Sequence, residues 1–287
     1  MGKVVSLVRK EFLSLQGLGK PMLIRKINRK CPPISLYWWR DLDNGIYNFG
    51  DEITQDIITG LFGYHVRWSA IWDCDMIGVG SLLDYAELNC RTNKIKVWGS
   101  GYIDKGDNCK KDNFTYYAVR GKRTLSRIDR HYKDIPLGDP GLLVSVIYPK
   151  QKNDGKIGII PHYVDLKSSF VKKIEKDEKF KIISPLQSPE RVAEQISACS
   201  VILSSSLHGI IFADSYGIPN AHISLSKKVI GGDYKFKDYC SGVGREYISF
   251  DKKDINNIDK ILVVKDKYKP IKRLKRIQRK LVKAFPY

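Results

Sequence analysis

The sequence predicts an α/β protein made of two doubly wound domains, each a parallel sheet with covered faces. Short apolar runs typical of buried strands alternate with helical stretches through both halves of the 287 residues. A polar stretch at 149–155 (PKQKNDG) separates the halves and is typical of a linker. Ligands of open parallel sheets bind at the carboxyl ends of the strands. We therefore expect the functional site in a cleft between the two domains.

Four segments are predicted along the chain: a basic N-terminal arm (1–33), an N-terminal Rossmann-like domain (34–148), a C-terminal Rossmann-like domain (149–262) and a basic amphipathic tail helix (263–287). In the tail, apolar residues recur at helical spacing among lysines and arginines, namely Ile271, Leu274, Ile277 and Leu281. This pattern favours an anionic membrane surface. RNA binding, or a helix docked on the body of the protein, are the alternatives. The tail lacks interleaved aromatics, so we expect no nucleic-acid partner.

The chain is strongly basic, with 50 Lys and Arg against 31 Asp and Glu, a formal net charge of +19. This balance favours an anionic partner such as nucleic acid, a membrane surface or a phosphorylated substrate. No apolar run approaches the ~18 residues of a membrane span, and the first residues lack the features of a signal peptide. The six cysteines form no C-x-x-C pair and have no zinc-site spacing. We expect free thiols, no metal site and a cytoplasmic protein, peripheral on the inner face of the plasma membrane.

The first strand is expected at 34–39 (ISLYWW), followed by a polar turn and a helical stripe that ends at Gly63. The motif NFGDE lies at this crossing from strand to helix, with its acidic pair suited to the helix N-terminus. Its candidate ligand-binding residues are Asn48, Gly50, Asp51 and Glu52. Simple capping of the helix is the alternative.

Three further strands are expected in the first half, at 75–79, 95–98 and 114–119. Glycines follow the first two, but neither completes a G-x-G-x-x-G pattern, so a dinucleotide site is not expected. The third ends at a basic turn that would suit an anion clamp. The clamp residues are Arg120, Lys122, Arg123 and Thr124. Solvated surface charge is the rival interpretation.

The second half repeats the pattern, with strands at 157–160, 180–184, 201–203, 221–224 and 246–250. Its central stretch, 201–219 (VILSSSLHGIIFADSYGIP), reads as a strand, a serine turn and a helix. Backbone N–H groups at a helix N-terminus attract anions. Here hydroxyl groups stand beside them, from Ser204, Ser205 and Ser206, and His208 lies in the first helical turn. The alternative is that Ser206 only caps a core helix, with a half-buried His208.

Several short motifs recur in an order that resembles the polysaccharide pyruvyl transferase family over about residues 34–245. They are Asn48-x-Gly50-Asp51-Glu52, Arg120-Gly121-x-x-Thr124, Gly138-Asp139-Pro140-Gly141, Pro161-His162-Tyr163, Ser205-x-Leu207-His208-Gly209 and Phe236-Lys237-x-x-Tyr239. The resemblance implies a GT-B-like architecture, two Rossmann-like domains facing across a cleft. It implies phosphoenolpyruvate as co-substrate, with no redox cofactor. A cyclic pyruvate ketal would form on two hydroxyls of one sugar.

The resemblance also implies site residues. Leu207, Gly209 and Lys237 join the candidate binding residues. Some members carry Arg two residues before the motif histidine, where this chain has Ser206. The anion-binding role would then pass to a residue of the basic turn, such as Arg120, or to another cation.

The chemistry calls for groups that titrate near neutrality. We expect acid–base work from His208, with His162 second, on the sugar side, and Asp51 as a base or as the group that orients an acceptor hydroxyl. The acceptor would be a sugar or a lipid-linked oligosaccharide. A GT-B glycosyltransferase using a sugar nucleotide, or a non-catalytic basic protein that binds glycan or RNA, are the other possibilities.

Overall fold

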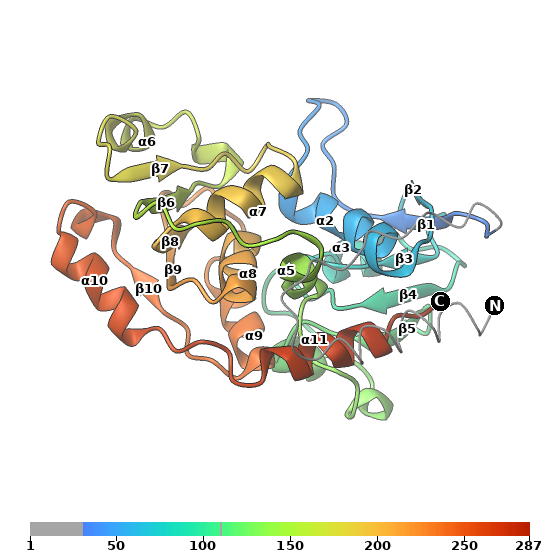
Figure 1. The fold of residues 1–287 in the computed structure, drawn as a ribbon. Helices are drawn as coiled ribbons and strands as arrows, with labels where there is room; N and C mark the ends of the chain where they lie inside the picture. The colour runs from blue at the N-terminus through green and yellow to red at the C-terminus, as the bar shows by residue number, and fades with distance from the viewer. Residues whose placement is uncertain (1–30, 110) are drawn as a thin grey trace.

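The computed structural model describes residues 31–109 and 111–287 and contains two five-stranded parallel sheets (Figure 1). The first is formed by β1 (Ile34–Tyr37), β2 (Val66–Trp68), β3 (Met76–Ile77), β4 (Ile95–Trp98) and β5 (Phe114–Ala118). The second is formed by β6 (Ile157–Ile160), β7 (Phe180–Ile182), β8 (Val201–Ser204), β9 (Asn220–Ile223) and β10 (Ser249–Phe250). The prediction of two parallel-sheet domains is confirmed.

Both sheets have the same doubly wound order. The strands run β2-β1-β3-β4-β5 in the first and β7-β6-β8-β9-β10 in the second. In such a sheet the strand order reverses at one point, and ligands bind in the crevice beyond the strand ends there. The reversal lies between β1 and β3 in the first sheet and between β6 and β8 in the second. The loops after these four strands are therefore the expected place for a site.

Helices cover the sheets. The first domain has α2 (Phe49–Ile57), which continues into a wider turn η1 (Ile58–Phe62), then α3 (Leu83–Asn89), α4 (Lys122–Leu125) and α5 (Val144–Ile147). The second has α6 (Ser169–Ile174), α7 (Pro189–Ala198), α8 (Leu207–Tyr216), α9 (Tyr234–Val243) and α10 (Ile258–Lys267). Short 3-10 turns connect them: η2 (Arg130–Tyr132), η3 (Pro140–Leu143), η4 (Tyr163–Asp165) and η5 (Lys252–Asp254).

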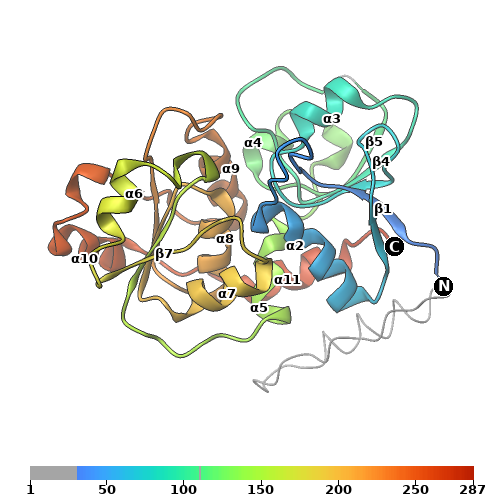
Figure 2. The same cartoon turned by 90° about the horizontal axis from the view of Figure 1, so that it is seen from above.

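The two domains share one continuous apolar core where α2 meets α7 and α8 (Figure 2). Phe49 at the start of α2 packs edge-on against Phe212 of α8, with ring centroids 5.0 Å apart. Both rings are fully buried. Burial of large aromatic side chains dominates the energetics of such contacts. The junction is thus a packed interior.

The C-terminal segment differs from the single tail helix expected at 263–287. It holds the end of α10, whose Ile261 and Val264 pack in the second domain, and a separate helix α11 (Leu274–Lys283). The two are divided near Arg273, which has a positive φ of 61°. The basic arm predicted at 1–33 lies almost wholly outside the described residues.

Helix α11 returns to the first domain and packs beneath it (Figure 1). Trp98 at the end of β4 donates its indole N–H to the carbonyl oxygen of Leu281 at 2.9 Å. Beyond the helix, Phe285 stacks on Phe62 with ring centroids 3.9 Å apart. The apolar face of the predicted membrane helix is therefore occupied by the protein itself, as the docked alternative expects.

The structure also bears on membrane crossing. Within residues 31–109 and 111–287, every helix is too short or too polar to span a bilayer.

Candidate functional site

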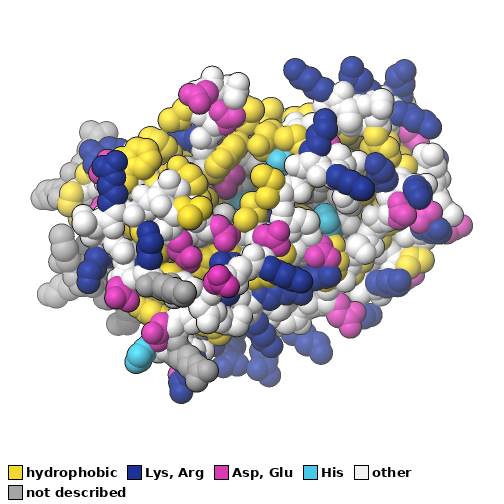
Figure 3. Space-filling model, turned by 180° about the vertical axis from the view of Figure 1, so that it is seen from behind, with side chains coloured by type: hydrophobic (Ala, Val, Ile, Leu, Met, Phe, Trp, Pro, Cys, Tyr) yellow, Lys and Arg dark blue, Asp and Glu magenta, His cyan; other side chains and the backbone are white. Residues whose placement is uncertain are grey.

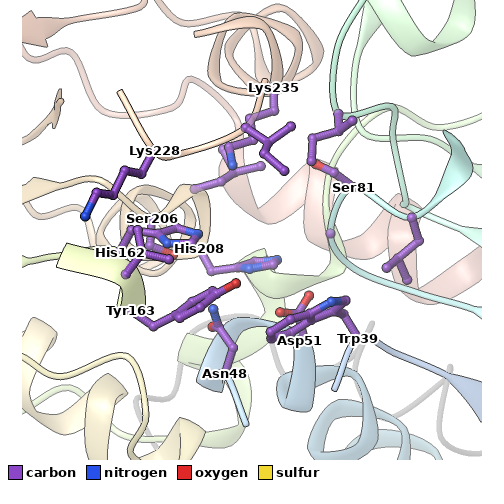
Figure 4. A pocket seen from close by; sticks show the side chains of 16 residues that line it. Trp39, Asn48, Asp51, Ser81, His162, Tyr163, Ser206, His208, Lys228 and Lys235 are labelled. Carbon is purple, nitrogen blue, oxygen red and sulfur yellow. The ribbon is translucent and has the colours of Figure 1, made fainter. Parts of the chain in front are cut away.

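Both points of strand reversal open onto one pocket of about 240 Å³ between the domains. The first domain contributes the loops after β1 and β3, and the second contributes those after β6 and β8, together with the start of α9. Figure 3, which shows the molecule from behind, has a hollow near the middle of the view, with histidine and acidic side chains beside apolar ones. The polar lining includes Asn48, Asp51, Ser81, His162, His208 and Lys235 (Figure 4).

His208 of the second domain projects between three glycines of the first. A Cβ atom added at Gly50 would lie 2.1 Å from His208 Nδ1, and one at Gly80 would lie 3.7 Å from its Cε1. Gly141 approaches the ring from a third side. Gly80 also has a φ of +93°, which favours glycine. The predicted binding residue Gly50 thus makes room for the histidine.

Burial lowers the pKa of both histidines that line the pocket. His208 is 5 % exposed, and burial with the nearby Arg120 and Lys235 lowers its pKa to about 3. Burial, together with Lys235, lowers the pKa of His162 to about 4. His208 Nε2 has no hydrogen-bond partner among the described residues and lies 3.9 Å from Asp139 Oδ2. Our expectation that the histidines titrate near neutrality does not hold without a ligand.

The carboxyl groups titrate closer to neutrality instead. Burial raises the pKa of Asp51 to about 7, against the opposing effect of Lys235. Burial likewise raises the pKa of Asp139 to about 6, although Asp139 accepts hydrogen bonds from the backbone N–H groups of Gly141 and Gly80. Across the described residues, no group of three or more His, Cys, Asp or Glu is placed to hold a metal ion.

The serine turn divides between the pocket and the interior. Ser206 lines the pocket and precedes α8 without a side-chain capping bond, and Leu207 lies beside it. The other two hydroxyls are committed to backbone carbonyls: Ser204 donates to Ser206 and Ser205 to Ile223, both at 2.8 Å. Gly209 allows close packing, because a Cβ there would lie 2.3 Å from Ser204 Oγ. The N-terminus of α8 therefore faces the pocket.

The basic turn after β5 does not reach the pocket. Arg120 is fully buried, ion-paired to Asp238 of α9 at 2.9 Å, and donates to Ser81 Oγ at 2.6 Å. Thr124 donates its hydroxyl to the same Asp238. These bonds tie the domains together and leave the guanidinium no free edge for a phosphate. Lys122 is exposed and Arg123 lies over the ring of Tyr234. These residues therefore do not form the predicted anion clamp at the pocket.

Two other predicted residues lie outside the pocket lining. Glu52 is held by a fork of two 2.7 Å hydrogen bonds from Arg40. Lys237 pairs with Asp233 on the surface of α9 at 2.5 Å.

Lys235 lines the pocket in place of Lys237. Burial, with the charge of Arg120, lowers the pKa of Lys235 to about 8. Residues two apart on a helix point about 200° apart, so the sequence alone could not say which lysine faces inward. Sequence analysis also missed Trp39 and Ser81, which follow strand ends as the candidates do, and the role of Asp139, which caps the turn η3.

Comparison with known proteins places the chain in a family. A family model described as "Polysaccharide pyruvyl transferase" matches residues 19–227. The chain belongs to the polysaccharide pyruvyl transferase family. It is 24% identical over 216 residues to the succinoglycan biosynthesis protein ExoV of Rhizobium meliloti, covering 74% of this chain and 65% of that protein. It is 41% identical over 140 residues to the uncharacterized protein L143 of Acanthamoeba polyphaga mimivirus, 45% of this chain and 48% of that one. The matches thus span between about half and two thirds of these relatives.

Proposed function

We propose that this pyruvyl transferase family member moves the pyruvyl group of phosphoenolpyruvate onto two hydroxyls of one sugar. A cyclic ketal forms and phosphate leaves, in the synthesis of an exopolysaccharide or other cell-surface glycan. The observation that carries the proposal is the His208 ring, unpartnered at Nε2, between a buried lysine and a carboxyl group of raised pKa. The relative named for succinoglycan biosynthesis supports the glycan context.

Phosphoenolpyruvate suits the buried end of this pocket because it carries a phosphate and a carboxylate. The N-terminus of α8 presents backbone N–H groups and the positive end of its dipole. Lys235 is a buried cation, and Lys228 adds a second, exposed lysine to the lining. In the view of Figure 4, His208 lies between Lys235 above and Asp51 below. Some family members carry an anion-binding arginine where this chain has Ser206, and Lys235 takes over that role here.

The reaction needs one proton delivered and others removed. The methylene carbon of phosphoenolpyruvate gains a proton, so that the neighbouring carbon becomes cation-like and is attacked by a sugar hydroxyl. A second hydroxyl of the same sugar then displaces phosphate. A bound anion raises the pKa of His208, because it offsets the positive field of Arg120 and Lys235. His208 then serves as the proton donor, Asp51 accepts a proton from the attacking hydroxyl, and His162 stands on the sugar side.

We propose an architecture and a cellular setting that match this reaction. The two domains form a GT-B-like pair that needs phosphoenolpyruvate as co-substrate and no redox cofactor. The protein works in the cytoplasm on a lipid-linked oligosaccharide at the inner face of the plasma membrane. Because the apolar face of α11 is docked, membrane attraction would come from its exposed basic side chains, such as Lys275 and Arg276.

The test is phosphate release from phosphoenolpyruvate, with and without a lipid-linked or oligosaccharide acceptor fraction. We expect acceptor-dependent release matched by acid-labile pyruvate on the glycan. The His208→Ala variant should lose at least about a hundredfold in rate, whereas His131→Ala serves as control because that side chain is 91% exposed. If phosphoenolpyruvate neither reacts nor protects the protein against heat, and a sugar nucleotide does, the chain is a glycosyltransferase instead.

A further inference from the structure

An aromatic pair stands at the mouth of the pocket, where the two domains meet. Trp39 follows β1 in the first domain, and Tyr163 follows β6 in the second. Their rings are stacked, with centroids 5.5 Å apart and planes inclined by 25°. Both are half-buried and line the pocket (Figure 4). Each domain thus supplies one ring to a shared surface.

Contacts of neighbouring residues anchor the chain next to this pair. Arg40, next to Trp39, is fork-bonded to Glu52 and lies 4.5 Å above the ring of buried Trp38. On the other side, the ring of His162 lies 4.4 Å from that of Tyr163. A preformed aromatic surface loses little conformational entropy when a ligand binds to it.

Two exposed aliphatic side chains also line this pocket. Ile230 is 71% exposed and Val164 is 37% exposed, and both line the same pocket. Exposed apolar side chains gathered at a pocket mark a binding site. The surface does not suit phosphoenolpyruvate, whose charges match Lys235 at the buried end. It suits a ligand with an apolar face and a hydroxylated edge, as a pyranose ring has.

We infer that the acceptor's pyranose ring packs its C–H face against the Trp39–Tyr163 pair, on ring surface that the two stacked side chains leave uncovered, with its reacting hydroxyls turned inward toward Asp51 and His162. The orientation of the hydroxyls rests on the proposed function. The stacking itself rests on the aromatic pair and its apolar surroundings. The pair is a platform for the carbohydrate, and it sets the distance of the ring from the buried end.

Saturation-transfer NMR on the full chain tests the platform without any turnover. The probes are methyl glycosides of galactose, glucose and mannose, none of which needs phosphoenolpyruvate. We expect saturation at the ring C–H protons of at least one glycoside. The signal should fall strongly in Trp39→Ala and in Tyr163→Ala. Trp72→Ala is the matched control, because Trp72 is 39% exposed and lies outside the pocket lining.

Kinetics separates this inference from the reaction itself. With a reacting acceptor, Trp39→Leu and Tyr163→Leu should raise the acceptor KM by about tenfold, equivalent to about 1.4 kcal/mol, and leave the KM for phosphoenolpyruvate within about twofold. Near-ultraviolet circular dichroism checks that the variants are folded. No saturation of any glycoside, or a signal that folded variants of both rings retain, overturns the platform even if the protein turns over phosphoenolpyruvate. Ring-dependent glycoside binding without turnover supports the platform and counts against the proposed donor.

Discussion

Replacing Gly50 by Ala adds one methyl group directly against the proposed proton donor. The new Cβ would lie 2.1 Å from His208 Nδ1 and 2.3 Å from its Cγ, where ordinary contacts begin near 3.4 Å. The ring must therefore move by roughly 1 Å or more, and a displacement of that size can reduce a rate about a hundredfold. We expect a loss of that order in acceptor-dependent phosphate release.

The free-energy cost to folding should be of the same order as the barrier increase behind a rate loss of about a hundredfold, or smaller. Overpacking costs about 1–3 kcal/mol, and the gain in helix propensity on replacing glycine offsets up to about 1 kcal/mol. Gly60→Ala is the matched control. Gly60 lies in η1, which continues the helix of Gly50, and a Cβ there would approach only Ile147, at 3.3 Å. Both variants are compared by urea unfolding and by phosphate release. A folded Gly50→Ala protein with the wild-type rate would refute the placement of His208 at the reacting atoms.

Three further changes test other parts of the structure. Burial raises the pKa of Asp51 from its ordinary value of 3.8 to about 7, so this carboxyl costs stability progressively as the pH rises between those values and in full above about pH 7. Asp51→Asn should therefore raise the melting temperature at pH 8 and give no gain near pH 4; a gain equal at both pH values would contradict this. Arg120→Met leaves the Asp238 carboxylate buried without its ion-pair partner, so urea unfolding should show a loss of about 3–5 kcal/mol in the free energy of unfolding. The loss should be much smaller when Asp238→Leu is added, and additive losses from the two substitutions would contradict the coupling. Reversing the charges of Lys275 and Arg276 should weaken binding to anionic vesicles at low salt while the melting temperature changes little; unchanged binding would exclude α11 as the membrane contact.

The pattern of apolar residues was enough to predict an α/β protein with two parallel sheets. The short apolar runs 157–160 and 201–203, bounded by polar or turn residues, were interpreted as buried strands, and the structure has buried strands there. The positions after strand ends, such as Asp51 and His208, reached the pocket because parallel strands present their carboxyl ends at one edge.

Charge was a poorer guide than position. Arg120 follows a strand end and is cationic, yet it is saturated by Asp238, a residue 118 positions away that no local pattern connects to it. Lys235 and Lys237 look alike in sequence, and only the packing of α9 turns Lys235 inward. The pKa shifts of His208 and Asp51 likewise arise from burial between two domains, which a linear sequence does not display.

The return of α11 to the first domain has a consequence for synthesis on the ribosome. The first sheet is complete once β5 has been made, but Trp98 and Phe62 still lack the partners supplied by Leu281 and Phe285. Those partners are translated more than 150 residues later, after the whole second domain. During that interval the emerging first domain exposes an apolar strip, a surface that chaperones bind. Premature stop codons that remove only α11 should therefore yield a chain prone to aggregation, even though the pocket residues have all been translated.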